Sequence, residues 1–586
     1  MASQDTVRQD LPPSITDAGD AGSPTDTATG GGSFDGVSIE NSSSKHSAKE
    51  ITEAGTEEAL ADGTPSISPS DQAFSKDAIS STQTHIIVAS LCLLYFISAL
   101  DMTVLATVYI DISNDYKSLQ SGVWIITSYL LATTATQPLF GKFSDILGRF
   151  EAVAMSCLFF CLGSVICASA NSMTMLVAGR AVQGIGGGGL MAMPSVILGD
   201  VVSERERGKF TSFLAGSWGV ASAVGPVMGG AIVEKASWRI IFWINLPICV
   251  PVAIVLFFTL KLPRPKGSIR EKFRRIDILG SVVFQGFIIP IIIAFAWAGQ
   301  GRSWVSGQVI GTILGSLAVG AVFLIIEWKV APDPMMPLRL LKVRNVAASC
   351  VCHFCLGACI YSPLMFIPLW ELAVRHATEI NAGLSTLPLM IAMVVAAGVS
   401  GFITTRYGRF REQAWLCGVL IAAGNSLLLL YTPTAPLWQR IVFLGLTGLG
   451  LGFGVQTLII AAQSAVGGLD MAATTVLILF MRTLGGIASL SILSSVFNTQ
   501  IRSGADKLDI QFPAYAGFIG TTLDDQSVIG KASSLPPELL VGLTNMYHDA
   551  MHKVFLGLVP FSALMVLSTL FIAHIDLQHL RKKTIK

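Results

Sequence analysis

Apolar segments long enough to cross a lipid bilayer follow one another along most of this 586-residue chain. A helix needs about 18 or more apolar residues to cross a hydrocarbon core of ~30 Å. Short polar segments separate the runs, as loops between membrane helices do. The pattern predicts an all-α polytopic membrane protein with fourteen transmembrane helices, at about 86–107, 121–141, 152–170, 174–198, 211–233, 239–260, 277–297, 307–327, 346–368, 384–403, 414–431, 440–463, 472–496 and 553–574.

The composition agrees with a protein that lies mostly in the lipid bilayer. Hydrophobic residues make up 52% of the chain and charged residues only 13%, whereas a soluble protein has about 25% charged residues. The net charge is +1, and we expect no nucleic-acid partner. No ATP-binding motif is present, so we expect no cofactor. If the protein moves a solute across the membrane, the energy must come from a gradient. We expect a transporter rather than an enzyme.

Two landmarks recur in the chain at one fixed spacing. The segment GKFSDILGR at Gly141–Arg149 returns as GFITTRYGR at Gly401–Arg409, an offset of 260 positions (401 − 141). Arg180 and Arg440 open similar glycine-rich segments and have the same offset (440 − 180). Duplicated units of apolar helices are typical of secondary transporters. The repeat predicts two six-helix halves, with the seventh and eighth helices inserted between them.

The repeat and the composition together divide the chain into segments. Residues 1–84 are rich in Ser, Thr, Gly, Asp and Pro, which predicts a disordered tail. Lys and Arg gather in alternate loops, which places both termini in the cytoplasm. We expect a monomer in the plasma membrane, with the vacuolar membrane as the alternative. The remaining segments are an N-terminal half at 85–262, the inserted helices with flanking loops at 263–344, a C-terminal half at 345–575 with a long outer loop at 497–552, and a cytoplasmic tail at 576–586.

Four motifs carry a resemblance to a known family. They are the loop motif of Gly141, Asp145, Gly148 and Arg149; Leu100–Val104 in the first helix; Arg180, Gln183 and Gly184 in the fourth; and Gly225, Pro226, Gly229 and Gly230 in the fifth. Trp238–Pro247 opens the sixth helix in a similar way. The set resembles the major facilitator superfamily, and within it the fourteen-spanner drug:proton antiporters of the fungal toxin and multidrug efflux pump type. The resemblance implies the major facilitator fold and export in exchange for protons.

Asp101 and Arg180 are the candidates for proton coupling, together with Gln183 of the same motif. An ionisable side chain inside a membrane helix costs ~2.5–3.5 kcal/mol and marks a functional candidate. Counted along their helices, Asp101 and Arg180 lie at the same depth. A carboxylate beside a movable cation can take up and release a proton as access alternates. The alternative is a static ion pair that orients two helices.

Two further motifs have candidate mechanical roles. Gly141, Asp145, Gly148 and Arg149 are expected to form a cytoplasmic gate, in which Asp145 pairs with Arg149 or a neighbouring helix end and latches the two halves. The alternative is a tight basic loop that only fixes topology. The resemblance implies that the fifth-helix motif marks antiporters, and that it bends the helix and seals it against leak. The alternative for this motif is an ordinary proline kink.

The substrate is predicted from the scarcity of charge inside the helices. Gln137, Tyr361, Gln456 and Gln463 offer neutral hydrogen bonding in a mostly apolar cavity, which suits a small amphipathic organic compound. The run CVCHFCLGAC at Cys350–Cys359 reads as helix packing, and we expect no metal. The leading function is export of drugs, toxins or secondary metabolites. The alternatives are a siderophore or basic amino acid carrier and, more distantly, a membrane sensor that does not transport.

Overall fold

The apolar segments all form α-helices in the computed structural model, which describes residues 80–116, 119–202, 204–262, 278–299, 301–329, 336–467, 470–524 and 536–573. These residues contain no β-strand. The expected tails, 1–84 and 576–586, lie almost wholly outside this range. The helices are α1 (Ser81–Asp115), α2 (Leu119–Ile146), α3 (Arg149–Ala168), α4 (Met173–Val201), α5 (Glu204–Lys235), α6 (Arg239–Trp243), α7 (Asn245–Thr259), α9 (Ile278–Gly299), α10 (Gly307–Lys329), α11 (Arg344–Arg375), α12 (Glu379–Leu384), α13 (Leu387–Tyr407), α14 (Arg411–Leu427), α15 (Leu437–Gln463), α16 (Met471–Gln511), α17 (Ala516–Asp524) and α19 (Pro537–Leu570), with short 3₁₀ turns at Leu338–Lys342, Leu428–Leu430 and Pro513–Tyr515.

Thirteen helices within the described residues are long and apolar enough to cross a membrane. Each of them falls on one of the fourteen segments predicted from the sequence. The predicted segment without such a helix is 121–141. It is occupied by α2, which has 28 residues and contains Pro138. At 1.5 Å per residue α2 is long enough to cross the bilayer, so the count of fourteen stays a prediction.

The helix bounds keep the 260-residue offset of the repeat. Adding 260 to the bounds of α1 gives 341–375, and α11 spans 344–375. The same shift carries α2 onto 379–406, which α12 and α13 occupy together, and α4 onto 433–461, which α15 occupies. The turns after α2 and α13 also correspond, because Gly148 and Gly408 both have positive φ, at 126° and 69°. That backbone conformation favours glycine, which has no Cβ to clash.

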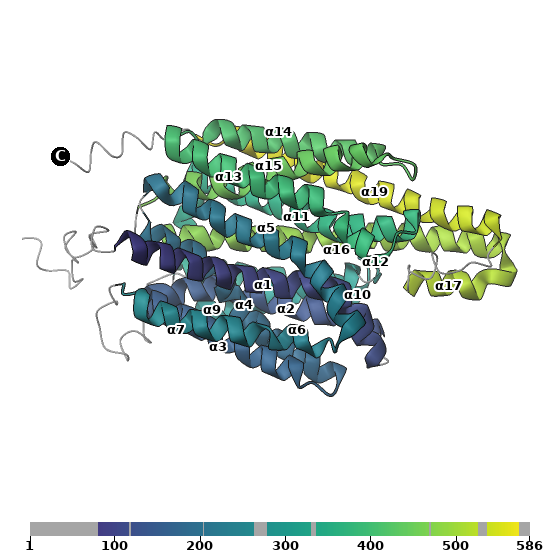
Figure 1. Cartoon of the computed structure of the whole chain (residues 1–586), viewed down its shortest axis with the longest axis horizontal. Coiled ribbons are helices and arrows are strands. Elements are labelled where there is room, and N and C mark those ends of the chain that lie inside the picture. The colour runs from purple at the N-terminus through teal and green to yellow at the C-terminus, as the bar shows by residue number, and fades with distance from the viewer. Residues whose placement is uncertain are drawn as a thin grey trace, which may run out of the picture. The chain divides into compact units, whose positions relative to one another are not determined.

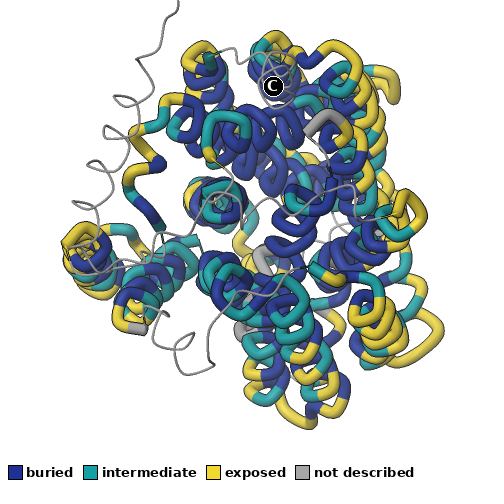
Figure 2. Tube along the Cα trace, turned by 90° about the vertical axis from the view of Figure 1, so that its left-hand side faces the viewer, coloured by how far each residue is buried: buried dark blue, intermediate teal, exposed yellow. Residues whose placement is uncertain are grey.

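The helices pack into two groups that follow chain order. Helices α1 to α7 pack against one another and form the N-terminal bundle, and α11 to α19 form the C-terminal bundle. Figure 1 shows α13, α14 and α15 along one side, and α3, α6 and α7 along the other. Contacts between the bundles are made mainly by α5 with α13 and α15, and by α16 with α2 and α4. Viewed along the helices, buried residues lie inside and exposed ones on the periphery (Figure 2).

Helices α9 and α10 form a pair that attaches to both bundles through α9. The two helices pack against each other, and α9 also packs against α16 and α2. Phe284, Ile288 and Ile292 of α9 form a buried apolar cluster with Ala135 of α2 and Phe480 of α16. Large side chains of α10 are exposed, including Leu314, which is 61% exposed. Such a surface suits contact with lipid, so α10 lies on the outside of the bundle.

The bundles meet closely at the end of the helices that carries Gly141–Arg149, which we call the motif end. A Cβ added to Gly141 of α2 would lie 2.7 Å from Val476 Cγ2 of α16. A Cβ added to Gly401 of α13, the repeat partner of Gly141, would lie 2.5 Å from the carbonyl oxygen of Gly208 in α5. Ser212 of α5 donates a hydrogen bond of 2.9 Å to the Ala397 carbonyl in α13. The motif end is therefore closed by direct packing of one bundle on the other.

The segment 497–552, expected as a long outer loop, is helical over much of its described length. Helix α16 continues to Gln511, α17 follows, and α19 begins at Pro537. Ile501, Ala505 and Leu508 are buried at helical spacing, and the extended parts of α16 and α19 pack together. Figure 1 shows these ends and α17 reaching beyond the neighbouring helices. The apolar positions recur every three or four residues, so they continue the helix although the polar residues between them resemble a loop.

Candidate functional site

A buried ion pair joins α1 to α4 inside the N-terminal bundle. Arg180 Nη1 lies 2.5 Å from Asp101 Oδ2, and both side chains are at most 1% exposed. The equal depths predicted from the sequence thus correspond to a direct contact. Charges this deeply buried are tolerated only when they are paired and hydrogen-bonded.

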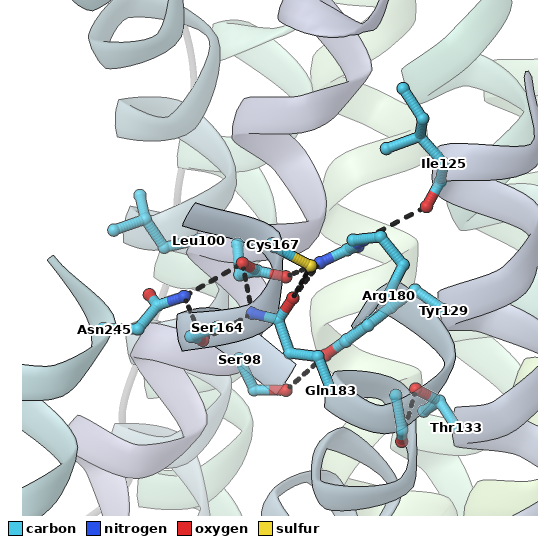
Figure 3. Close-up of polar contacts among 12 residues, drawn as sticks. Ser98, Leu100, Ile125, Tyr129, Thr133, Ser164, Cys167, Arg180, Gln183 and Asn245 are labelled. Carbon is cyan, nitrogen blue, oxygen red and sulfur yellow. Dashed lines mark hydrogen bonds and ion pairs between the residues drawn. The ribbon is translucent and has the colours of Figure 1, made fainter. Parts of the chain in front are cut away.

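Asp101 accepts hydrogen bonds from two amides as well as from the arginine. Gln183 Nε2 donates to Asp101 Oδ1 at 2.8 Å, and Asn245 Nδ2 donates to the same oxygen at 3.1 Å. Both amides also donate to the Ser164 hydroxyl, at 2.9 and 3.1 Å. Figure 3 shows Asn245, Ser164 and Gln183 converging on one point between the helices. Three donors on one carboxylate replace the hydrogen bonds to water that burial removes.

Arg180 is also held by groups from α2 and by Gln183 of its own helix. Its Nε donates to the Ile125 carbonyl at 3.1 Å, and its Nη1 donates to Gln183 Oε1 at 2.7 Å. The guanidinium carbon lies 4.2 Å from the centre of the Tyr129 ring, a cation–π contact. Tyr129 in turn shares a hydrogen bond of 3.1 Å with Ser98 of α1. These contacts keep the arginine within reach of Asp101 without a second carboxylate.

Glycines bring the helices close enough for this network to form. A Cβ on Gly163 of α3 would lie 2.5 Å from Gln183 Cβ, and one on Gly184 of α4 would lie 2.6 Å from the Tyr129 carbonyl oxygen. Small residues allow membrane helices to approach closely and to share hydrogen bonds. Ser164 directly follows Gly163, so the same close approach places its hydroxyl beside Gln183.

The second copy of the repeat has a different ion pair. Arg440, the repeat partner of Arg180, lies 3.0 Å from Glu371 Oε1, and Tyr431 donates to that oxygen at 3.2 Å. The position that corresponds to Asp101 is Tyr361 (101 + 260). The acidic partner is therefore ten residues further along α11, near the C-terminal end of that helix. Only the N-terminal bundle has the carboxylate at the Asp101 position.

A small cavity lies between the two bundles and is lined by residues from both. Tyr95 of α1 and Trp218 of α5 face Tyr361 of α11 and Arg482 of α16 across it. The rings of Trp218 and Tyr361 meet edge to face, with centres 6.4 Å apart. The rest of the lining is Ala215, Ile360, Met393 and Val455. The walls are mostly apolar and aromatic, with one buried cation.

Of the four residues predicted to line the cavity, the structure places Tyr361 on its wall. The Gln463 amide donates to Thr475 at 2.7 Å, and its oxygen accepts from Arg207 at the motif end. Gln137 accepts a long hydrogen bond from Thr483, at 3.4 Å. Gln456 is buried, and its amide atoms have no hydrogen-bond partner among the described residues. The three glutamines are thus not among the residues that line this cavity.

The loop motif forms ion pairs within the N-terminal bundle rather than across the bundles. Arg149 lies 2.5 Å from Asp145 and 2.7 Å from Asp200, at the end of α4. It also donates to the Ser144 hydroxyl at 2.6 Å. Arg149 therefore ties the ends of α2, α3 and α4 together. The latch predicted between the halves is therefore not formed by the charged residues of the motif, whose ion pairs stay within the N-terminal bundle. Gly141 is the motif residue that contacts the other bundle.

The fifth-helix motif packs against α1 beside Asp101. Helix α5 runs without interruption through Gly225, Pro226, Gly229 and Gly230. A Cβ on Gly225 would lie 2.8 Å from Thr103 Cβ, whereas one on Gly230 would meet nothing within 4 Å. Thr103 also donates to the Ala221 carbonyl of α5 at 3.2 Å. The motif thus brings α5 against the turn of α1 that carries Asp101.

Several residues of the site were not assigned a role from the sequence. Asn245 belongs to the motif at the start of the sixth segment, so its position was a usable signal. Ser164 and Glu371 belong to no motif and carry no such signal. The cysteines of the run Cys350–Cys359 are buried and not in disulfides, and Cys359 accepts a hydrogen bond of 3.4 Å from Asn425. The described residues contain no group of three or more His, Cys, Asp or Glu side chains placed to hold a metal ion.

A many-helix membrane protein built from two similar bundles, with a cavity between them and a buried ion pair, belongs to the class of secondary transporters. The family model of the Major Facilitator Superfamily matches residues 91–490. The chain therefore belongs to the major facilitator superfamily and is a multi-pass membrane transporter.

Curated relatives extend the similarity along most of the chain. The aspyridones efflux protein of Neocamarosporium betae is 34% identical over 71% of this chain and 74% of its own length. Efflux pump FUS6 of Gibberella moniliformis is 34% identical over 73% of this chain and 76% of its own. The chain is thus similar to fungal efflux pumps of this superfamily.

A solved structure supports the fold alone. The inward-facing, unoccupied bacterial homologue of the human lysosomal transporter Spinster aligns with a TM-score of 0.53 at 15% identity. The alignment covers 84% of this chain and 98% of that one. The two six-helix halves of the major facilitator fold correspond to the two bundles, and α9 and α10 are the inserted pair.

Proposed function

We propose that this protein exports small amphipathic organic compounds, such as drugs, toxins or secondary metabolites, in exchange for protons. Curated relatives named efflux pumps support the direction of transport. The buried carboxylate of Asp101, with its arginine and two amides, supports the coupling. The mostly apolar cavity between the bundles supports the substrate class.

Proton exchange follows from what Asp101 loses when it is protonated. A neutral carboxyl no longer attracts Arg180 as an ion pair, and its protonated oxygen accepts hydrogen bonds less well. Arg180 then depends on Gln183, the Ile125 carbonyl and the Tyr129 ring for its contacts. A change of charge on α1 is thereby converted into a change in how α4 and α7 are held.

The motif end is proposed to be the cytoplasmic gate. Its glycine contacts close the path between the bundles at that end, and the excess of Lys and Arg in its loops supports a cytoplasmic location. Both termini then lie in the cytoplasm, and we place the chain, as a monomer, in the plasma membrane. Export requires this gate to open for substrate and to close before release on the other side.

The test uses the purified full chain in proteoliposomes with an imposed proton gradient. Pyrenebutyramide, pyrenebutyrate and ethidium serve as a neutral, an anionic and a cationic aromatic probe. The wild type should move at least one of them at a rate that rises with the gradient. Asp101→Asn should insert in the membrane and bind the probe, yet lose gradient-driven movement.

Glu371→Gln is the matched control, because it also removes the carboxylate of a buried arginine pair, in the other bundle. Removing one partner of a buried pair costs about 3–5 kcal/mol, so both variants bear a similar loss of stability. Gradient-driven transport at the wild-type rate by Asp101→Asn would rule out Asp101 as the coupling group. Failure of the wild type to move any of the three probes would contradict the proposed function.

A further inference from the structure

The cavity between the bundles contains one buried cation without a carboxylate partner. Arg482 of α16 is 6% exposed and lines the cavity. Its Nη2 donates to the Tyr95 hydroxyl at 3.0 Å. No ion pair links Arg482 to an acidic side chain among the described residues. A guanidinium has five N–H donors, and this single hydrogen bond leaves most of them for another acceptor.

Two other arginines of the bundles have acidic partners. Arg180 pairs with Asp101 at 2.5 Å, and Arg440 pairs with Glu371 at 3.0 Å. Arg482 instead adds a positive charge to the cavity that no acidic side chain among the described residues pairs with. An unpaired charge inside a membrane protein costs several kcal/mol and marks a pathway or ligand site. An anion that enters the cavity would balance it.

Helices α11 and α16 approach each other closely at Arg482. A Cβ on Gly357 of α11 would lie 2.8 Å from the Arg482 carbonyl carbon, and one on Gly486 would lie 2.8 Å from Tyr361 Cε2. The Arg482 side chain reaches Tyr95 of the other bundle. The arginine thus belongs to the C-terminal bundle and has its hydrogen-bond partner in the N-terminal bundle.

The neighbouring rings define the rest of the ligand. Trp218 and Tyr361 meet edge to face, and Ala215, Ile360, Met393 and Val455 complete an apolar lining. The cavity has a volume of only about 20 Å³ while the bundles are packed together, so a flat aromatic or conjugated body would lie against these rings once the bundles part. Arg482 suits a carboxylate or a similarly acidic oxygen group, which a guanidinium binds through two hydrogen bonds.

We infer that the preferred substrate is an amphipathic organic anion, whose acidic group binds Arg482 while its apolar body lies against Trp218 and Tyr361. This inference rests on the proposed function and narrows its substrate class. Because Tyr95 and Trp218 belong to one bundle and Tyr361 and Arg482 to the other, the anion would contact both bundles at once. Binding of the acid would then favour the state in which the bundles are close around it.

The experiment measures binding without a gradient, so that it is independent of coupling. The purified full chain in lipid nanodiscs is titrated with pyrenebutyrate or with pyrenebutyramide, which has nearly the same shape and no charge. Energy transfer from tryptophan to pyrene reports binding. The wild type should bind the acid at least about tenfold more tightly than the amide, which corresponds to ~1.4 kcal/mol.

Variants of Arg482 test whether this preference comes from its charge. Arg482→Gln should bind the two probes equally, and Arg482→Lys should keep part of the preference. Arg502→Gln changes an exposed arginine on the same helix and should keep all of it. If Arg482→Gln fails to fold, the lysine variant and the wild type decide, because acidifying the wild-type sample until the probe's carboxyl is protonated should remove the preference.

Three results would overturn the inference. They are equal affinity of the wild type for acid and amide, an unchanged preference in Arg482→Gln, and chloride competing with both probes equally, which indicates a halide site. Proteoliposomes separate this failure from failure of the proposed function. Gradient-driven movement of ethidium or the amide, but not of the acid, would contradict the anion preference alone.

Discussion

Asp101 accepts hydrogen bonds from side chains on two other helices, so its charge is felt beyond α1. Gln183 and Arg180 belong to α4, and Asn245 is the first residue of α7. Loss of the charge weakens all three contacts together. Under the proposed proton exchange, the network couples one proton to the relative position of three helices, which a single ion pair on two helices would not do.

Replacing Asn245 with leucine should slow gradient-driven transport. Asn245 donates to the Asp101 carboxylate, and a hydrogen bond to a charged group contributes about 1.5–3 kcal/mol. Without this donor the carboxylate no longer holds α7, so a change of charge on Asp101 reaches one helix fewer. The measurement is the rate of gradient-driven probe transport in proteoliposomes.

Ser164→Ala is the control for this prediction. It removes the hydroxyl that Gln183 and Asn245 share but leaves every donor on Asp101 in place. Its transport rate should stay closer to the wild type. Equal rates for Asn245→Leu and the wild type would mean that this donor does not contribute to the proposed coupling.

The central pair could be predicted from the sequence, and the groups around it could not. The depth of a residue in the membrane follows from its position along the helix and from the direction in which the helix crosses. Both can be read from the sequence, and they place Asp101 at the level of Arg180. The convergence of Ser164 and Asn245 depends on the rotation of α3 and α7 about their axes. That rotation is set by contacts such as Gly163 on Gln183, which no local pattern specifies.

At the scale of single helices, the loop motif acts through its first glycine in both copies. Gly141 touches α16 and Gly401 touches α5, and α16 is the repeat counterpart of α5. The two contacts are therefore related by the internal symmetry of the chain. Both depend on the lack of a side chain, since a methyl group would overlap the opposite helix.

Gly401→Ala should shift the population toward states that are open at the motif end. The added Cβ would lie 2.5 Å from the Gly208 carbonyl oxygen, and overpacking of this kind costs about 1–3 kcal/mol. A cost of ~1.4 kcal/mol changes the population ratio about tenfold. Labelling of a cysteine placed at Thr404, which is buried in the closed state, reports opening.

Gly398→Ala provides the matched control on the same helix. A Cβ at Gly398 meets nothing within 4 Å, so the substitution should leave the labelling rate unchanged. The same rate in both variants would show that the Gly401 contact does not hold the gate closed.

The inserted helices should affect stability more than substrate choice. Ser316 of α10 is buried, and its hydroxyl has no hydrogen-bond partner among the described residues. Ser316→Asn adds volume and a second polar group at a site that cannot satisfy them, which should lower the thermal stability and the yield. Gly315→Ser, an exposed neighbour with open space around it, should have little effect.

Substrate profile decides between this prediction and a pore-lining role. The rates for the three probes, normalised to the amount of inserted protein, should keep their wild-type order in Ser316→Asn. A reordered profile at normal expression would place α10 on the transport path.

The helices themselves were predictable because each needs only one long apolar run. The ends of α16 and α19 were not, since polar residues between their buried positions hide the period. Leu508 lies against Gly542 of α19, which follows it by 34 residues (542 − 508). Only that partner makes the extended helices more stable than a loop.

For the whole molecule, the proposed transport cycle requires the bundles to separate at the motif end, and one residue pair offers a direct test. A Cβ on Gly141 would lie 3.2 Å from Val476 Cβ, near the 3.5–4.5 Å that a disulfide spans. The double substitution Gly141→Cys and Val476→Cys also removes the valine methyl groups that would clash. Oxidation should link the bundles, stop probe transport, and leave binding in the nanodisc assay intact.

A reducing agent should restore transport, and each single variant should be insensitive to oxidant. The native cysteines are free and mostly buried, so the single variants control for their reaction. Full transport by a chain that mass spectrometry shows to be cross-linked would mean that the bundles need not separate here.

At this scale the repeat predicted the symmetry but not its departures. The offset of 260 residues relates Arg180 to Arg440, yet their acidic partners lie at different positions on α1 and α11. Tyr361 therefore lines the cavity where Asp101 forms an ion pair. The 260-residue offset describes the positions of the backbones in the two halves. The partner of each side chain depends on the residues that surround it.

Helix α9 has hydrogen bonds to both bundles. Gln285 of α9 donates to the Ala135 carbonyl of α2 at 2.8 Å, and Asn498 of α16 donates to the Gly299 carbonyl at the end of α9 at 2.8 Å. Hydrogen bonds from one helix to both bundles limit how far the bundles can separate beside that helix. We therefore expect the proposed transport cycle to be asymmetric, with the wider opening on the side that α9 does not cross.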